Sequence, residues 1–215
     1  MRRAFLAILM CAMAVWAGAQ AANAQAQGQK RIAIRAGKLI DGKGGAPITN
    51  ALIVIEGNKI ISVTGGAGPS ASSGQAIPPG AEIIDLSRAT VMPGFIDTHT
   101  HILLQGDITA ADYDEQLLKQ SIPYRAILAA RNTRIALEHG FTSMRDLETE
   151  GAMYADVDVK TAINRGEVPG SRMFVATRAR APTGMYPLLG YSWELAMPHG
   201  VQVVDGVENA RLAVR

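Results

Sequence analysis

The chain has 215 residues, of which 48% are hydrophobic, 19% charged and 5% aromatic, so it is too apolar and too weakly charged for a disordered protein. Its 21 basic and 19 acidic residues give a formal net charge of +2, and the two arginines near the N-terminus account for that excess. This balance excludes a strongly basic nucleic-acid-binding protein and a polybasic membrane-binding protein.

Residues 1–24 have the three parts of a secretory signal peptide. A basic pair is followed by fourteen consecutive apolar residues and by an Ala-Asn-Ala motif that ends at Ala24. The pattern predicts cleavage near Ala24 and a secreted or periplasmic protein with no stable membrane association, with residues 25–30 as a spacer. The alternative is an uncleaved N-terminal anchor, although a bilayer span needs about 20 apolar residues. Cys11, the only cysteine, lies inside this segment.

Residues 31–90 have the pattern of a small β domain. Short apolar or alternating runs are separated by turns rich in glycine, and a longer Gly/Pro/Ser-rich loop covers residues 65–80. The predicted strands are residues 31–35, 51–55, 59–63 and 81–86. Strands at this spacing are typical of a sandwich or a partial barrel, and we expect the N-terminal part of a small β-sandwich domain.

Residues 91–215 change to an alternation of strands and helices. We expect strands at residues 91–96, 141–147 and 172–177, and helices at residues 124–138, 157–164 and 207–214. Strands that alternate with helices over short links form parallel sheets with crossover helices. The predicted fold class is therefore α/β.

Two of the four histidines, His99 and His101, stand at the end of a hydrophobic strand. Side chains at i and i+2 of a strand share a face, so the two imidazoles are expected to project together, with Cα atoms about 7 Å apart. Neutral imidazole is a good ligand for zinc and related metals. Asp97 would lie on the same face, either as a ligand or as an acceptor that orients a histidine. The alternative is a pair of ordinary hydrogen-bonded histidines.

Several motifs in order resemble the amidohydrolase superfamily, in its imidazolonepropionase-like and Xaa-Pro dipeptidase-like branch. Residues 91–101 (VMPGFIDTHTH) closely resemble the signature that closes the first strand of that family's (β/α)8 barrel. Further matches are residues 39–42 (LIDG), 84–86 (IDL), 140–147 (GFTSMRDL), 168–173 (VPGSRM), 176–179 (ATRA) and 182–184 (PTG). The resemblance covers the chain from about residue 31 to its end.

The resemblance implies an incomplete (β/α)8 TIM-type barrel preceded by a small β-sandwich. A barrel of this type takes about 250 residues, whereas 114 residues follow His101. In the family the later strands supply a carboxylated lysine, two histidines and an aspartate, and neither His139 nor His199 matches these ligands. We therefore expect an N-terminal fragment that is inactive alone, with its catalytic residues beyond Arg215.

The implied reaction is hydrolysis of a C–N bond, in a cyclic or peptide-like amide, by a metal-activated water. His99 and His101 would hold one of one or two divalent ions, with zinc expected and manganese, iron or cobalt as alternatives. The substrate would be a small molecule or a short peptide.

Three residues are weaker candidates for contact with the substrate. Arg178 and Arg180 stand near the end of the third predicted strand and suit a substrate carboxylate, or else they form structural ion pairs or are solvated. For Arg145 and Asp146 an intra-barrel salt bridge is expected. Tyr186 belongs to an aromatic and apolar loop that either lines a substrate pocket or covers the barrel.

Two other interpretations stay open at this point. In the first, the protein is a non-catalytic binding or scaffold protein that keeps the amidohydrolase fold. In the second, the 215-residue chain is itself the mature product. In the second case the open sheet edges would favour a homo-oligomer.

Overall fold

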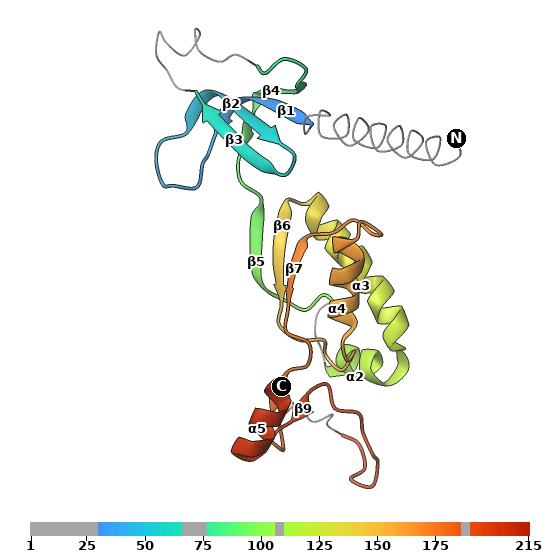
Figure 1. Ribbon diagram of the computed structural model, residues 1–215. Coiled ribbons are helices and arrows are strands. Elements are labelled where there is room, and N and C mark those ends of the chain that lie inside the picture. The colour runs from blue at the N-terminus through green and yellow to red at the C-terminus, as the bar shows by residue number, and fades with distance from the viewer. Residues whose placement is uncertain (1–29, 66–76, 106–109, 186–189) are drawn as a thin grey trace, which may run out of the picture. The chain divides into compact units, whose positions relative to one another are not determined.

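The computed structural model describes residues 30–65, 77–105, 110–185 and 190–215. The predicted signal peptide of residues 1–24 and Tyr186 lie outside the described residues. The chain divides into two compact units, Met1–Pro93 and Gly94–Arg215 (Figure 1). Within the described part of the chain, no helix combines the length and the apolar character needed to cross a membrane.

The first unit is a four-stranded sheet in the order β3-β2-β1-β4. Its strands are β1 (Arg31–Leu39), β2 (Ile48–Glu56), β3 (Lys59–Thr64) and β4 (Glu82–Val91). β2 is antiparallel to β1 and β3, whereas β1 and β4 are parallel. The four predicted strands are thus present, but the described residues of this unit form one layer. The second layer of the predicted sandwich remains a prediction.

β4 is longer at its C-terminal end than its sequence predicts. Residues 87–90 are Ser-Arg-Ala-Thr and have no apolar run, but β1 pairs with them, with Lys38 opposite Thr90 and Leu39 opposite Val91. The register shifts between Ala36 and Lys38, and Gly37 stands at this irregularity. A Cβ atom at Gly37 would lie 2.3 Å from the carbonyl oxygen of Ser87, so the close approach of the two strands requires glycine.

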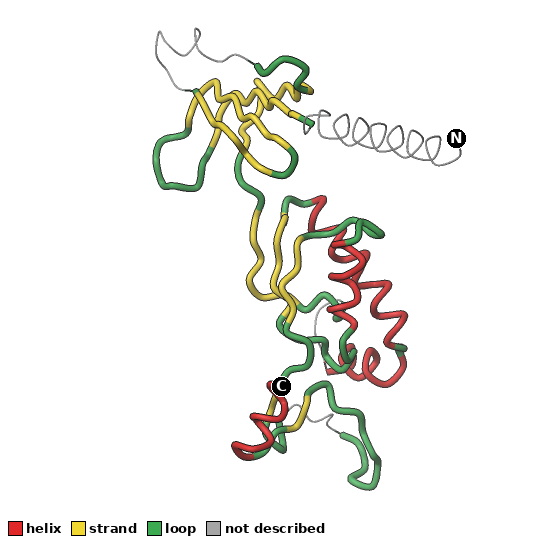
Figure 2. Tube along the Cα trace, viewed as in Figure 1, coloured by secondary structure: helices red, strands yellow, loops and turns green. Residues whose placement is uncertain are grey.

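The second unit contains a three-stranded parallel sheet in the order β5-β6-β7. Its strands are β5 (Phe95–Thr100), β6 (Phe141–Asp146) and β7 (Arg172–Val175), and they are linked by α2 (Ala110–Lys119), α3 (Ile122–Glu138) and α4 (Ala155–Asn164). α3 and α4 lie on the same face of the sheet (Figures 1 and 2). The parallel β-α-β-α-β order predicted from the sequence is confirmed.

The core of this unit lies between the sheet and the helices α3 and α4. Its buried members include Leu103, Ala129, Met144, Val159 and Met173, one or more from each layer. Because this core holds the carboxyl ends of β5 and β6 in register, it fixes the backbone that carries the candidate site. A closed (β/α)8 barrel remains a prediction, since the described strands form an open sheet.

Three features of this unit differ from the sequence prediction. The first strand was expected at residues 91–96, but β5 is Phe95–Thr100 and Val91 belongs to β4. α2 was not predicted, because its sequence AADYDEQLLK has a high share of polar residues and only a short apolar stripe. The third strand was expected to reach residue 177 but ends at Val175. Thr177 has a φ angle of 64°, which an extended strand does not allow.

The C-terminal part contains a short parallel pair, β8 (Arg180–Ala181) and β9 (Gln202–Val203), followed by α5 (Gly206–Val214). The sequence predicted a helix at residues 207–214, and α5 agrees with that prediction. The two-residue strands were missed because they are too short to show an alternating pattern.

Candidate metal centre

His99 and His101 lie together at the carboxyl end of β5. The centroids of their rings are 5.3 Å apart, and the ring planes meet edge to face at 60°. His99 is exposed and His101 is partly buried, with 24% of its side chain exposed. Imidazoles this close at the end of a parallel strand suit a shared cation, because β/α folds place ligand sites at that edge of the sheet.

Asp97 contacts the backbone of the histidine segment, and its expected role as a ligand or as an orienting acceptor stays a prediction. Its carboxylate accepts a hydrogen bond from the backbone N–H of His99 at 3.1 Å, not from an imidazole. β5 is irregular, with register shifts between Phe95 and Ile96 and between Asp97 and Thr100. The strict two-residue alternation therefore fails here, and Asp97 borders a hollow on the side of α3, next to Asn132 and His139.

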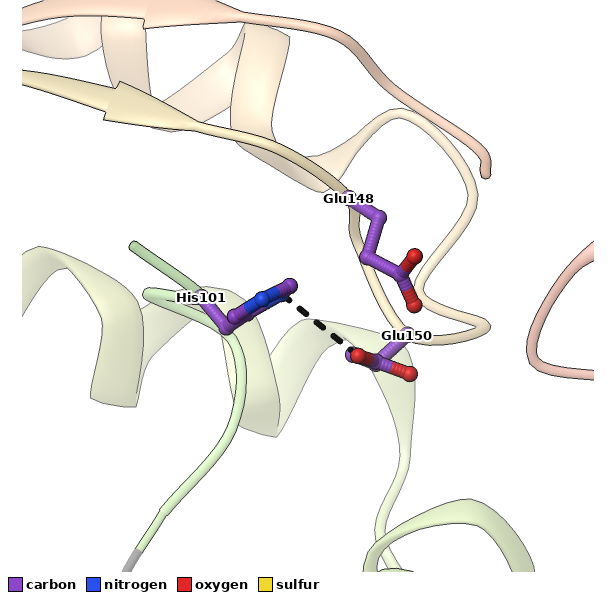
Figure 3. Close-up of side chains that lie close together, drawn as sticks. All are labelled: His101, Glu148 and Glu150. Atoms are coloured by element: carbon purple, nitrogen blue, oxygen red, sulfur yellow. Dashed lines mark ion pairs between the residues drawn. The ribbon is translucent and has the colours of Figure 1, made fainter. Parts of the chain in front are cut away.

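Two glutamates that follow the next strand, β6, lie beside His101. Glu148 and Glu150 belong to the turn after β6, and the two residues are only 7% and 5% exposed. His101, Glu148 and Glu150 each place one possible ligand atom within 4.8 Å of the other two (Figure 3). His101 Nδ1 lies 3.5 Å from Glu150 Oε1. Within the described residues, these are the three side chains whose ligand atoms lie close enough together either to bind a cation directly or to support one that the histidines bind.

The sequence does contain a pattern that predicts these glutamates beside the histidines, although they were not among the predicted site residues. They stand at i and i+2 directly after a predicted strand that is parallel to the strand of the histidines. Parallel strands bring their carboxyl ends to one edge of the sheet, so a search of that edge would have found them. The stretch that resembles the family, residues 140–147, ends at Leu147, one residue before Glu148.

Burial governs the electrostatics of this edge of the sheet. Burial and the neighbouring carboxyl of Glu150 raise the pKa of Glu148 well above its ordinary value. Burial also raises the pKa of Asp146 to about 7, although a hydrogen bond from the backbone of Ile102 opposes that change. Several carboxyl groups therefore compete for protons in a small volume, and a bound cation would relieve that competition.

The donor set fits a divalent metal. His101 Nδ1, Glu148 Oε1 and Glu150 Oε2 are buried, and none of them has a hydrogen-bond partner. A buried polar atom without a partner costs about 1–3 kcal/mol, and a cation or its bound water can satisfy such atoms. Imidazole and carboxylate together suit zinc, manganese, iron or cobalt.

Hydrogen bonds from neighbouring elements hold the two strand ends that carry the site. Asp146 accepts from the backbone N–H of Ile102 at 2.8 Å, which ties β6 to the residue after His101. The backbone N–H of Thr149 donates to the carbonyl of Thr177 at 2.9 Å. These contacts link the segments after β5, β6 and β7 into one rim.

Of the other predicted site residues, Arg178 and Arg180 belong to the described part of the chain and Tyr186 does not. Arg180 belongs to β8, where its guanidinium donates twice to the carbonyl of Ala213 in α5, at 3.0 and 2.6 Å. This contact fits the structural alternative for Arg180. Arg178 is half-buried, and its contact with a substrate remains a prediction, as does that of Tyr186.

Among the described residues, Arg145 and Asp146 do not form the intra-barrel salt bridge expected for them and bond to the backbone instead. Arg145 donates to the carbonyl of Thr98 at 2.9 Å, while Asp146 is fully buried and accepts from Ile102. Adjacent residues of a strand point to opposite faces, so each of the two finds a backbone partner on its own side.

Comparison with known proteins fits this geometry. Residues 90–214 match the amidohydrolase family, so the match covers more than half of the chain.

The chain belongs to the amidohydrolase family.

Solved structures similar to this amidohydrolase chain include two peptidases. A Xaa-Pro dipeptidase with bound methionine in its active site is 29% identical, with a TM-score of 0.71, over 86% of this chain and 44% of that chain. A prolidase complexed with N-methylphosphonate-L-proline is 30% identical, with a TM-score of 0.68, over 86% of this chain and 43% of that chain. The chain thus spans less than half the length of these proteins.

Among curated proteins, imidazolonepropionase from Thermoplasma acidophilum is similar to a shorter part. It is 38% identical over 58 residues, which are 27% of this chain and 12% of that protein. The branch predicted from the sequence motifs therefore appears in both comparisons.

Proposed function

We propose that this chain carries the first part of a metal-dependent amidohydrolase that cleaves a C–N bond in a short, peptide-like substrate. The observation that carries the proposal is the pair His99 and His101 at the carboxyl end of β5, in the segment that matches the family. The similarity to a Xaa-Pro dipeptidase and a prolidase favours an Xaa-Pro dipeptide over a cyclic amide.

In this proposal the histidines hold a divalent ion, for which zinc is the first choice. A bound ion of this kind lowers the pKa of a water ligand towards about 7 and polarises the scissile carbonyl. The chain's own part is to hold the two imidazoles at the strand end. The buried carboxylates of Glu148 and Glu150 add negative charge beside His101, which favours a cation over an anion at this edge.

The remaining ligands and the residue that moves the proton are proposed to come from later strands of a longer chain. The incomplete coverage of the similar structures supports this view. A secreted or periplasmic location and assembly into a homo-oligomer are further proposals. The location rests on the pattern of residues 1–24. The homo-oligomer belongs to the alternative in which the 215-residue chain is the mature product and its sheet stays open.

The test is an assay on the longest natural translation product that contains this sequence. Hydrolysis of a panel of Xaa-Pro dipeptides is measured before metal removal, after treatment with a chelator, and after zinc or manganese is returned. We expect hydrolysis to fall to background in the stripped protein and to return with the metal. Hydrolysis that persists after complete metal removal would contradict the proposal. Metal binding without hydrolysis of any amide would favour the scaffold alternative.

A further inference from the structure

Glu150 faces one particular nitrogen of His101. Its Oε1 atom lies 3.5 Å from His101 Nδ1, and that nitrogen is buried with no hydrogen-bond partner. A shift of about 0.5 Å would bring the pair into the range of an N–H···O hydrogen bond. Contacts of this kind are often long without the bound ligand and tighten when it binds.

The position of Glu150 is fixed through its backbone by Arg125 of α3. The Arg125 side chain is only 2% exposed and donates to the carbonyls of Glu150 at 2.8 Å, Thr149 at 3.2 Å and Leu103 at 3.1 Å. One guanidinium therefore joins the segment after β5, which follows His101, to the turn after β6, which carries Glu150. This connection sets the separation of the histidine and the carboxylate.

The position of Glu150 leaves one nitrogen of His101 for a metal that His99 shares. The two rings lie 5.3 Å apart, but His99 is not among the three side chains whose ligand atoms gather around the glutamates. A metal held by both histidines needs one nitrogen of His101, and Glu150 faces Nδ1. The nitrogen that remains is Nε2.

We propose that Glu150 is a positioning residue that accepts the Nδ1–H proton of His101 and so directs Nε2 of that ring to the metal. This role rests on the proposed function only in taking His99 and His101 as the metal ligands. A carboxylate acceptor behind a metal-binding imidazole fixes its tautomer and orientation and strengthens it as a ligand. Arg125 contributes indirectly, because its hydrogen bonds hold the turn that carries the Glu150 carboxylate.

The direct test is ¹⁵N NMR of the full chain, labelled at histidine and free of metal. The His101 signals are assigned by their loss in His101→Asn. We expect the proton of neutral His101 on Nδ1, the less common tautomer of free histidine, and we expect added zinc to shift the Nε2 signal. A proton on Nε2 overturns the proposal, and so does zinc bound at Nδ1, which would make the glutamates direct ligands. This measurement uses the unaltered protein, so it does not depend on whether a variant folds or on whether any substrate is hydrolysed.

Zinc titration of variants gives a second readout. Glu150→Leu removes the acceptor, and we expect zinc affinity to fall about 10- to 100-fold, with the His101 proton moving to Nε2. Glu150→Gln keeps an acceptor oxygen and should retain the Nδ1 proton and most of the affinity. Glu167→Leu replaces an exposed glutamate and is the matched control. Unchanged zinc affinity in a folded Glu150→Leu variant overturns the proposal. If the positioning role is right and the proposed hydrolysis wrong, the tautomer and the affinity change remain while the dipeptide assay shows no activity.

Discussion

At the scale of single residues, the most informative side chain beyond the metal centre is Asp146. It is fully buried, and one oxygen, Oδ2, has no hydrogen-bond partner. Its burial raises its pKa from 3.8 to about 7. In the unfolded chain the carboxyl loses its proton near pH 4, whereas the folded chain retains it up to about pH 7. The stability contributed by the protonated form is therefore present at low pH and is lost as the pH rises from about 4 to about 7.

We expect Asp146→Asn to remove this pH dependence. The amide oxygen still accepts from Ile102, but no charge develops, so the variant should exceed the original chain in stability at pH 8 by up to about 4 kcal/mol, and by little at pH 4. Urea unfolding of the metal-free proteins at the two pH values measures the difference. Asp158→Asn, in which an exposed acid of α4 is replaced, is the matched control. Equal pH dependence in Asp146→Asn and the original chain would rule out this account of Asp146.

Single residues also show where sequence reasoning succeeded and where it failed. The proximity of the His99 and His101 rings is confirmed, because their spacing at the end of a hydrophobic strand determines it; their binding of a metal stays a prediction. Glu150 was missed because glutamates are common on surfaces, and only the pairing of β5 with β6 brings this one to His101. For Asp97 the residue pattern did not predict the register shifts that interrupt β5, nor the hydrogen bond that its carboxylate accepts from the backbone N–H of His99.

At the scale of elements, α3 supports the site through Arg125. Replacing this side chain by methionine leaves three buried carbonyls without their donor. We expect Arg125→Met to lower the free energy of unfolding by about 3 kcal/mol or more. Arg131→Met, at an exposed position of the same helix, should change it by less than about 0.5 kcal/mol. Denaturant unfolding compares the two variants, and similar small losses in both would show that the Arg125 contacts contribute little.

The pairing of β1 with β4 gives a prediction for the first unit. A Cβ at Gly37 would lie 2.3 Å from a backbone oxygen of β4, so the strands must separate if alanine is introduced. We expect Gly37→Ala to destabilise the unit by about 1–3 kcal/mol, the usual range for overpacking. Gly45→Ala is the control, because a Cβ there meets nothing within 4 Å. Thermal unfolding followed by circular dichroism measures both, and an equal melting temperature for the two variants would contradict the steric argument.

At the scale of the whole molecule, the order of the elements could be predicted from the sequence, but the way they assemble could not. The alternation of strands and helices after residue 91 predicted parallel β5, β6 and β7, because crossover helices leave a clear periodic pattern. The two-residue strands β8 and β9 and the polar helix α2 leave no such pattern. The family could be recognised from motifs spread along the chain, whereas the completed barrel depends on strands that the described residues do not contain.

The central claim is that His99 and His101 hold a metal for amide hydrolysis, and metal content tests it most directly. The full chain, its His99→Asn/His101→Asn double variant and a His199→Asn control are equilibrated with zinc, freed of unbound ion and analysed by native mass spectrometry. We predict one or two ions per molecule in the original chain and in the control, and at least one ion fewer in the double variant. The same number of ions in all three proteins would contradict the claim.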